Sequence, residues 1–212
     1  MDLKIIVADD HPMFRAAVSH VLADLLDGCG VVEVASQSAL EAAIANHEGI
    51  DLVLLDLNMP GAMGLSSVAL LRCVRPDLPL IVISSNDHPD VINRSKQFGA
   101  AGFVSKANSA NSLRAAVEAV MAGETWFSDD LDPPSAKDVH LARQLAQLTP
   151  QQMRVLMLLA EGLLNKQIGY SLGVTENTIR NHVAAILSKL ECRSRTQAAM
   201  LVRALGAERA HH

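Results

Sequence analysis

Short apolar runs alternate with amphipathic helical patterns along the first 125 residues of the chain. Five of these runs have the length and apolar character of strands, and they lie at residues 3–8, 31–35, 51–56, 79–84 and 101–104. After the first run, apolar residues recur every three or four positions, which predicts a helix with one buried face. Strands and helices that alternate at this spacing predict an α/β domain, a doubly wound five-stranded parallel sheet of flavodoxin-like order 2-1-3-4-5.

This pattern stops near residue 126. The segment Ser128–Ser135 contains two prolines, three aspartates and few apolar residues, which favours a linker. A short helix is compatible with residues 137–147. We therefore predict a first domain over residues 1–125, a linker over 126–147 and a second domain over 148–212.

The second domain is predicted to be all-helical. Thr149-Pro150 supplies an N-cap and a proline at the first helical position. A short helix beginning at Asn165, a turn at Gly173 and an amphipathic helix capped by Thr175 follow, and a last helix covers about 195–205. A short helix, a glycine-containing turn and a second amphipathic helix predict a helix-turn-helix fold.

Charge differs strongly between the two parts of the chain. Residues 1–130 carry 8 basic and 17 acidic side chains, a net charge of −9, whereas residues 148–212 carry 8 basic and 4 acidic ones, a net charge of +4. A basic domain favours nucleic acid as a partner. No stretch has the roughly 18 apolar residues of a membrane span, and neither a signal peptide nor paired cysteine spacing is evident, so we expect a cytoplasmic protein without a membrane partner.

Polar side chains end four of the predicted strands. Asp9-Asp10 follow the first strand, Asp56 ends the third, Ser84 ends the fourth and Lys106 follows the fifth. In a doubly wound sheet, the carboxyl ends of the first and third strands are neighbours at the point where ligands bind. These side chains are therefore expected to share one cleft.

Three clustered carboxylates need a compensating charge. Each like-charged pair at about 4 Å costs on the order of 4 kcal/mol at an effective dielectric constant near 20, which is a large fraction of the stability of a small domain. Oxygen ligands of this kind suit Mg²⁺, and Mg²⁺ with a carboxylate nucleophile suits phosphoryl transfer. We predict that Asp56 is the nucleophile, that Lys106 pairs with the incoming phosphoryl group and that Ser84 donates a hydrogen bond to it.

Three segments resemble the receiver domains of the NarL/FixJ class of bacterial response regulators. They are Asp9-Asp10-His11-Pro12-Met13-Phe14-Arg15, Asp56-Leu57-Asn58-Met59-Pro60-Gly61 and Gly99-Ala100-Ala101-Gly102-Phe103-Val104-Ser105-Lys106. The resemblance implies that Asp56 is the phosphoacceptor. It also implies that Mg²⁺ is bound by Asp10 directly, by Asp9 through water, by Asp56 and by the backbone carbonyl of Asn58. Ser84 and Lys106 would contact the phosphoryl group, and Ser84 and Phe103 would form the conformational switch.

The basic domain resembles the LuxR-type helix-turn-helix in the segments 162–168, 175–183 and 193–199. By that resemblance Arg180, Asn181 and Ala184 occupy base-reading positions, and Thr178 lies on the same face. Arginine can pair with guanine and asparagine with adenine in the major groove. Contacts to DNA phosphates, which set the register of binding rather than its sequence, are predicted for Lys166, Thr175, Lys189 and Arg195.

The resemblances together imply a two-component response regulator, a DNA-binding transcription factor rather than an enzyme. A sensor histidine kinase would phosphorylate Asp56 with Mg²⁺ as cofactor, and the phosphorylated form would bind two DNA half-sites as a homodimer. In the unphosphorylated state the receiver would mask the recognition helix, in an equilibrium that phosphorylation shifts.

Two other functions stay open at this point. A metal-dependent phosphatase would also use an aspartyl-phosphate, but that class needs a second aspartate where this chain has Asn58. An interaction protein whose helix-turn-helix no longer reads DNA is compatible with the small, uncharged Ala184 and Ala185 on the groove-facing side. DNA binding that weakens steeply with salt would exclude this last function.

Overall fold

The computed structural model describes residues 3–25, 29–128 and 131–206. These described residues divide into two compact units: those within 1–62 and 76–134, and those within 63–75 and 135–212. Among the described residues, no helix combines the length and the apolar character that crossing a bilayer requires.

One parallel sheet forms the centre of the first unit. Within the described residues its strands are β1 Lys4–Ala8, β2 Gly30–Val34, β3 Leu52–Asp56, β4 Leu80–Ser84 and β5 Gly102–Ser105. The strand order is β2-β1-β3-β4-β5, and every pairing is parallel. This order confirms the predicted doubly wound fold, and each observed strand lies within one residue of its predicted start and end.

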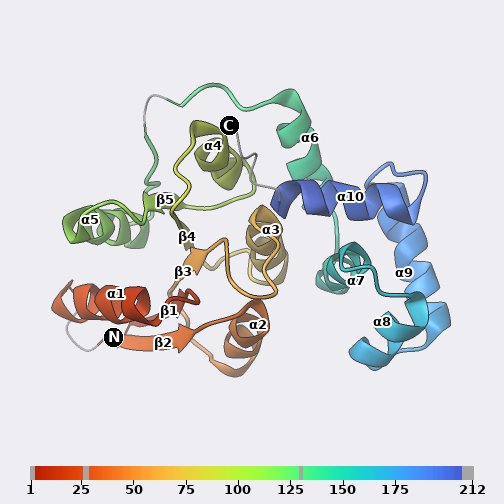
Figure 1. The fold of residues 1–212 in the computed structure, drawn as a ribbon, viewed down its shortest axis with the longest axis horizontal. Coiled ribbons are helices and arrows are strands. Elements are labelled where there is room, and N and C mark those ends of the chain that lie inside the picture. Colours follow the sequence, from red (N-terminus) through yellow and green to blue (C-terminus); the bar gives the residue numbers. More distant parts are fainter. Residues whose placement is uncertain (1–2, 26–28, 129–130, 207–212) are drawn as a thin grey trace. The chain divides into compact units, whose positions relative to one another are not determined.

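Helices connect the successive strands. They are α1 Pro12–Leu25, α2 Gln37–Asn46, α3 Leu65–Val74, α4 Pro89–Gln97 and α5 Ala110–Met121. Figure 1 shows α1 and α5 together on one side of the sheet and α2 and α4 on the other side. Because both faces are covered, β3 and β4 are buried over their whole length, which explains why their sequences are continuous apolar runs.

The core on the α1 and α5 side is aliphatic. It includes Leu22 of α1 and Leu54 of β3, which are at most 1% exposed, and Val117 of α5. Phe14 and Trp126 pack against the edge of this cluster. The predicted helical stripe of the first helix is thus confirmed as a core-facing surface.

The segment after α5 returns to the sheet edge before the chain leaves this unit. Trp126 forms a parallel bridge with Gly102, and the Phe103 amide donates to the Trp126 carbonyl at 2.9 Å. Part of the predicted linker therefore covers the open edge of β5. Another part forms helix α6, Ala136–Leu145, and residues 129–130 lie outside the described residues. The boundaries at 125 and 147 stay a prediction.

The basic part of the chain folds into α7 Pro150–Ala160, α8 Asn165–Leu172, α9 Glu176–Lys189 and α10 Arg195–Gly206. The predicted caps are confirmed: Thr149 and Gln152 form a reciprocal capping box, and the Thr175 hydroxyl accepts from the Thr178 amide at 3.2 Å. Gly173 has a φ of 66° between α8 and α9, a left-handed conformation that glycine adopts without strain. This is the predicted helix-turn-helix.

Candidate functional site

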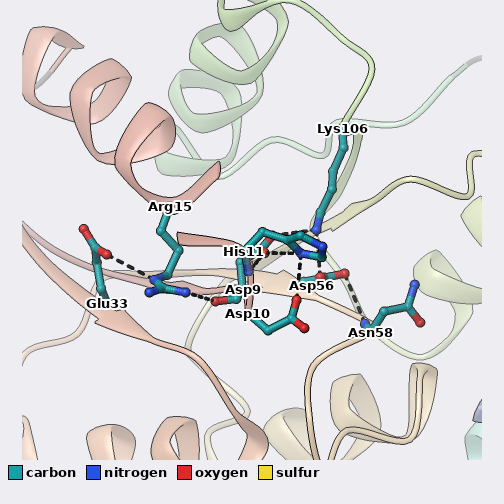
Figure 2. A network of polar contacts seen from close by, with 8 residues as sticks. All are labelled: Asp9, Asp10, His11, Arg15, Glu33, Asp56, Asn58 and Lys106. Atoms are coloured by element: carbon teal, nitrogen blue, oxygen red, sulfur yellow. Dashed lines mark hydrogen bonds and ion pairs between the residues drawn. The ribbon is translucent and has the colours of Figure 1, made fainter. Parts of the chain in front are cut away.

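The polar strand ends meet at the carboxyl edge of the sheet, as Figure 2 shows for three of them. Asp9 directly follows β1, Asp56 is the last residue of β3, and Lys106 directly follows β5. The parallel register pairs Asp56 with Ile83, so Ser84 lies one residue further along the neighbouring strand. Sheet topology therefore joins residues that are 50 positions apart in the chain.

Lys106 holds two buried carboxylates together. Its Nζ lies 2.7 Å from Asp9 Oδ2 and 2.7 Å from Asp56 Oδ2, and these two aspartates are 2% and 1% exposed. Burial alone lowers the pKa of the Lys106 ammonium. Its hydrogen bonds to Asp56 and Asp9, together with their negative charges, raise the pKa by more than burial lowers it, so the net pKa is above its ordinary value of 10.5. The folded chain thus binds this proton more tightly than the unfolded chain. While the two carboxylates are ionised, this pairing adds stability that is fully present below the ordinary pKa of the lysine and is lost as the pH rises through the raised pKa.

The third carboxylate lies at the rim of the same cluster. One ligand atom from each of Asp9, Asp10, His11 and Asp56 lies within 4.8 Å of the others. His11 Nδ1 is 2.7 Å from Asp10 Oδ1 and 3.2 Å from Asp9 Oδ1. The formal charges of the three carboxylates and the Lys106 ammonium sum to −2, so the cluster has excess negative charge that a divalent cation would neutralise. Carboxylate oxygens are ligands that Mg²⁺ prefers.

The backbone of the loop after β3 also contacts the Asp56 carboxylate. The Asn58 amide donates to Asp56 Oδ1 at 3.1 Å, as drawn in Figure 2. This bond fixes the carboxylate rotamer, with Oδ2 directed to Lys106 and Oδ1 to Asn58. Ser84 is fully buried, and its hydroxyl accepts from the Asn86 amide at 3.1 Å.

Phe103, the predicted switch residue, is buried on β5. It lines a groove of about 370 Å³ together with Ile92 of α4 and Trp126. The register pairs Phe103 with Val82 and Ser105 with Ser84. Phe103 is therefore a near neighbour of Ser84 on the adjacent strand, and its role as a switch stays a prediction.

Four residues around the carboxylates have roles in the site that the sequence pattern did not predict. The Phe14 ring lies under Lys106, with 4.9 Å from Nζ to the ring centroid, and His11 contacts both neighbouring aspartates. Arg15 donates to the Asp9 carbonyl and pairs with Glu33 of β2. Glu33 had a signal in the sequence, because it is an acidic residue inside the apolar run Val31–Val34. The partner of that residue could only be found from the fold.

A second candidate site is the outer face of α9. Arg180, Asn181 and Ala184 are all exposed there, and Thr178 is half-buried. Arg180 Nη2 lies 3.4 Å from Glu176 Oε1, one turn earlier on the helix. The opposite face carries Ile179 and Ile186, which are fully buried. The helix thus presents its predicted base-reading positions to solvent.

The residues predicted to contact DNA phosphates have different surroundings. Lys166 is exposed, whereas Lys189 Nζ donates to the Gln147 carbonyl at 2.8 Å and to Gln152 Oε1 at 2.7 Å. Arg195 Nη2 donates to the Leu163 carbonyl at 2.7 Å, and the Thr175 hydroxyl caps α9. Three of the four therefore also hold the domain together, and their contacts to phosphate stay a prediction.

Comparisons with known proteins agree with both resemblances that the sequence motifs indicated. The family description "Response regulator receiver domain" matches residues 5–118, and "Bacterial regulatory proteins, luxR family" matches residues 146–202. The chain is 35% identical to the glycerol metabolism activator of Pseudomonas putida, with 92% of each chain covered. It is 34% identical to the nitrate/nitrite response regulator protein NarL of Escherichia coli K12, covering 93% of this chain and 94% of that one.

Solved structures of the Salmonella typhimurium RcsB response regulator share the fold. One of them covers 96% of this chain and 98% of its own, with a TM-score of 0.56 and 22% sequence identity. The isolated receiver domain of RcsB covers 62% of this chain and 96% of its own, with a TM-score of 0.56 and 23% identity.

Proposed function

Because this chain belongs to the DNA-binding response regulators, which join a receiver domain to a LuxR-type helix-turn-helix, we propose that phosphorylation of Asp56 controls its binding to DNA. A sensor histidine kinase would be the phosphoryl donor. The family is one of transcription regulators, and this confirms that the chain is a regulator rather than an enzyme. The phosphatase alternative is thereby removed.

The observation that carries the proposal is the double ion pair of Lys106 with buried Asp9 and Asp56. The Lys106 ammonium pairs with Asp56 Oδ2 and would stay beside this oxygen when the oxygen becomes part of an acyl phosphate. In the transfer, this oxygen attacks phosphorus, the bond between phosphorus and the kinase imidazole nitrogen breaks, and the imidazole retains the electron pair of that bond. Lys106 and Ser84 would then hold two oxygens of the phosphoryl group.

Mg²⁺ would be held by Asp9, Asp10, Asp56 and the Asn58 carbonyl, and it would offset negative charge as the phosphoryl group approaches. The excess charge of −2 in the cluster and its oxygen ligands support this assignment. Asp10 is suited to direct coordination, because it lies at the rim with its side chain 32% exposed.

In the helix-turn-helix, we propose that α9 enters the major groove of DNA. Arg180 and Asn181 would contact base edges, while Ala184 allows close approach and contacts thymine methyl groups. Two copies on two half-sites would bind more tightly than one, since the second contact becomes intramolecular. Phosphorylation would raise the fraction of the conformer that dimerises and binds DNA. We propose that the chain acts in the cytoplasm, which its match to bacterial DNA-binding regulators supports.

The experiment that tests the proposal compares wild type with Asp56→Asn. Both proteins are incubated with acetyl phosphate, with and without Mg²⁺, and are analysed by intact mass and by a gel shift on genomic fragments. We expect one phosphoryl adduct in the wild type only, dependent on Mg²⁺ and accompanied by tighter DNA binding. An adduct that persists in Asp56→Asn would assign the phosphoacceptor to another residue. DNA binding that is equal with and without the adduct would refute control by phosphorylation.

Arg180→Ala is expected to weaken DNA binding about tenfold or more. A bidentate contact to a base contributes about 1–3 kcal/mol, and 1.4 kcal/mol corresponds to a factor of ten. Its ion pair with Glu176 is exposed and contributes little to folding, so the domain should stay folded. The measurement is a salt titration of affinity on a fragment selected by the wild-type protein.

Arg143→Ala on α6 serves as the control for this variant, because it removes the same charge from an exposed position outside the helix-turn-helix. It should bind within about twofold of wild type. Two results together would show that the helix-turn-helix does not read DNA and that the chain is an interaction protein. They are a wild-type DNA affinity that does not depend on salt, and an Arg180→Ala affinity equal to that of wild type.

A further inference from the structure

We infer that Arg15, held by Glu33, is a positioning residue for the metal-binding loop of the receiver. It acts on the backbone of Asp9 rather than on the metal or the phosphoryl group. The inference rests on the proposed function, since it concerns the Mg²⁺ that Asp9 and Asp10 would bind. Figure 2 shows Arg15 and Glu33 on the side of Asp9 remote from Lys106.

Three hydrogen bonds make Arg15 and Glu33 a clamp on the Asp9 backbone. Arg15 Nη1 donates to the Asp9 carbonyl at 2.6 Å, and Arg15 Nε donates to Glu33 Oε2 at 3.1 Å. The other carboxylate oxygen of Glu33 accepts from the Ser19 hydroxyl at 2.9 Å. Glu33 is therefore anchored to α1 through two residues, and the guanidinium is held between β2 and the end of β1.

Both polar groups of the Asp9 backbone, its amide and its carbonyl, are linked to β2. Its amide donates directly to the Val34 carbonyl at 3.0 Å, and its carbonyl is bound through Arg15 to Glu33, the residue before Val34. The Asp9 carbonyl belongs to the planar peptide that joins Asp9 to Asp10. Fixing this peptide sets the direction in which the chain enters Asp10. A single clamp thus orients both carboxylates that would bind the metal.

Arginine is suited to this position because its planar guanidinium carries several donors in a fixed geometry. One edge can bind a carbonyl while Nε binds a carboxylate. The side chain is only 15% exposed, whereas Glu33 is 43% exposed. Its charge is locally balanced by Glu33, so the clamp acts through geometry more than through its net charge.

Charge and geometry make opposite predictions for Arg15→Gln. This variant removes a positive charge close to an acidic site, so simple electrostatics would tighten the binding of Mg²⁺. If Arg15 positions the Asp9 peptide, the same variant weakens Mg²⁺ binding, because the carboxylates lose their preset orientation. Residues that orient metal ligands typically contribute 10–100-fold to metal affinity, and we expect about tenfold here.

The experiment is a calorimetric titration of the full-length protein with Mg²⁺. Arg15→Gln should bind about tenfold more weakly than wild type. Arg15→Lys keeps the charge but lacks the planar fork, so it should lose about threefold, and a loss there reports geometry alone. Arg114→Gln on α5 makes the same charge change away from the clamp and should stay within twofold.

Phosphorylation by acetyl phosphate supplies a second measurement. The concentration of Mg²⁺ that gives the half-maximal rate should rise in Arg15→Gln in parallel with its dissociation constant, and saturating Mg²⁺ should restore most of the rate. Because Mg²⁺ also stabilises the folded state, circular dichroism of Arg15→Gln without Mg²⁺ must show that the variant is folded before the rescue is assigned to the metal site. If Arg15→Gln does not fold, Arg15→Lys carries the same test.

The outcomes separate the inference from the proposed function. If wild type binds no Mg²⁺, the proposed metal site is wrong and the inference falls with it. If wild type binds Mg²⁺ while Arg15→Gln and Arg15→Lys bind equally well or more tightly, the metal site stands and the positioning role of Arg15 is refuted.

Discussion

Lys106→Met is expected to destabilise the receiver by about 3–5 kcal/mol in the absence of Mg²⁺. Removing one partner of a buried ion pair leaves an uncompensated charge, and losses of this size are typical. Here one substitution leaves two carboxylates, Asp9 and Asp56, without their cation, and both are at most 2% exposed. Lys106 itself is only 16% exposed, so solvent screens the pairing little. Methionine fills most of the same volume, which limits any effect from a cavity.

Mg²⁺ should offset much of this loss. A ligand that binds only the folded state stabilises it, by about 2.7 kcal/mol when its free concentration is 100 times the dissociation constant. In Lys106→Met the cation relieves a larger repulsion, so Mg²⁺ should raise the free energy of unfolding by more than it does in wild type. Urea unfolding of both proteins, with Mg²⁺ and with a chelator, measures the two differences.

Lys96→Met is the matched control for this substitution. Lys96 is exposed on α4, with its ammonium 5.3 Å from the centre of the Phe127 ring. An exposed contact of this kind contributes about 0.5–1 kcal/mol, and its loss should not depend on Mg²⁺. If Lys106→Met were as stable as Lys96→Met in the presence of chelator, the account of a charge cluster held by Lys106 would be wrong.

The second large effect is expected for Leu22→Ala, which should lower the free energy of unfolding by about 2–5 kcal/mol. Leu22 is fully buried on the face of α1 that packs on the sheet. The substitution removes apolar contacts and leaves a cavity that the surrounding side chains fill only in part. Since α1 also carries Arg15, the midpoint of Mg²⁺ binding should be measured together with the unfolding curve.

Met13→Ala on the same helix is the control for Leu22→Ala. Met13 is 89% exposed, and methionine and leucine have similar helix propensities, so its truncation should change stability by less than about 0.5 kcal/mol. Similar losses in the two variants would mean that the Leu22 side of α1 does not face the core.

The fold was predictable from the sequence because both of its parts follow strong local rules. Continuous apolar runs such as Leu52–Leu55 are what a strand covered on both faces requires. Thr149, Thr175 and Gly173 act through bonds and backbone angles within a few residues of themselves, so their roles in capping and turning were visible without any tertiary information. The resemblance to known families added the predicted metal-binding and base-reading positions.

What the sequence by itself determined is therefore the order of elements, the two-part organisation and the set of strand-end residues that meet. Parallel strands place their carboxyl ends at one edge, so Asp9, Asp56 and Lys106 had to converge. Only the tertiary structure decided which atoms pair within that group. The choice of Lys106 as the shared partner of two carboxylates, and of Glu33 as the anchor of Arg15, depends on strand register and on side-chain rotamers. Register and rotamers are set by packing between elements that are distant in sequence, so the local sequence pattern cannot predict them.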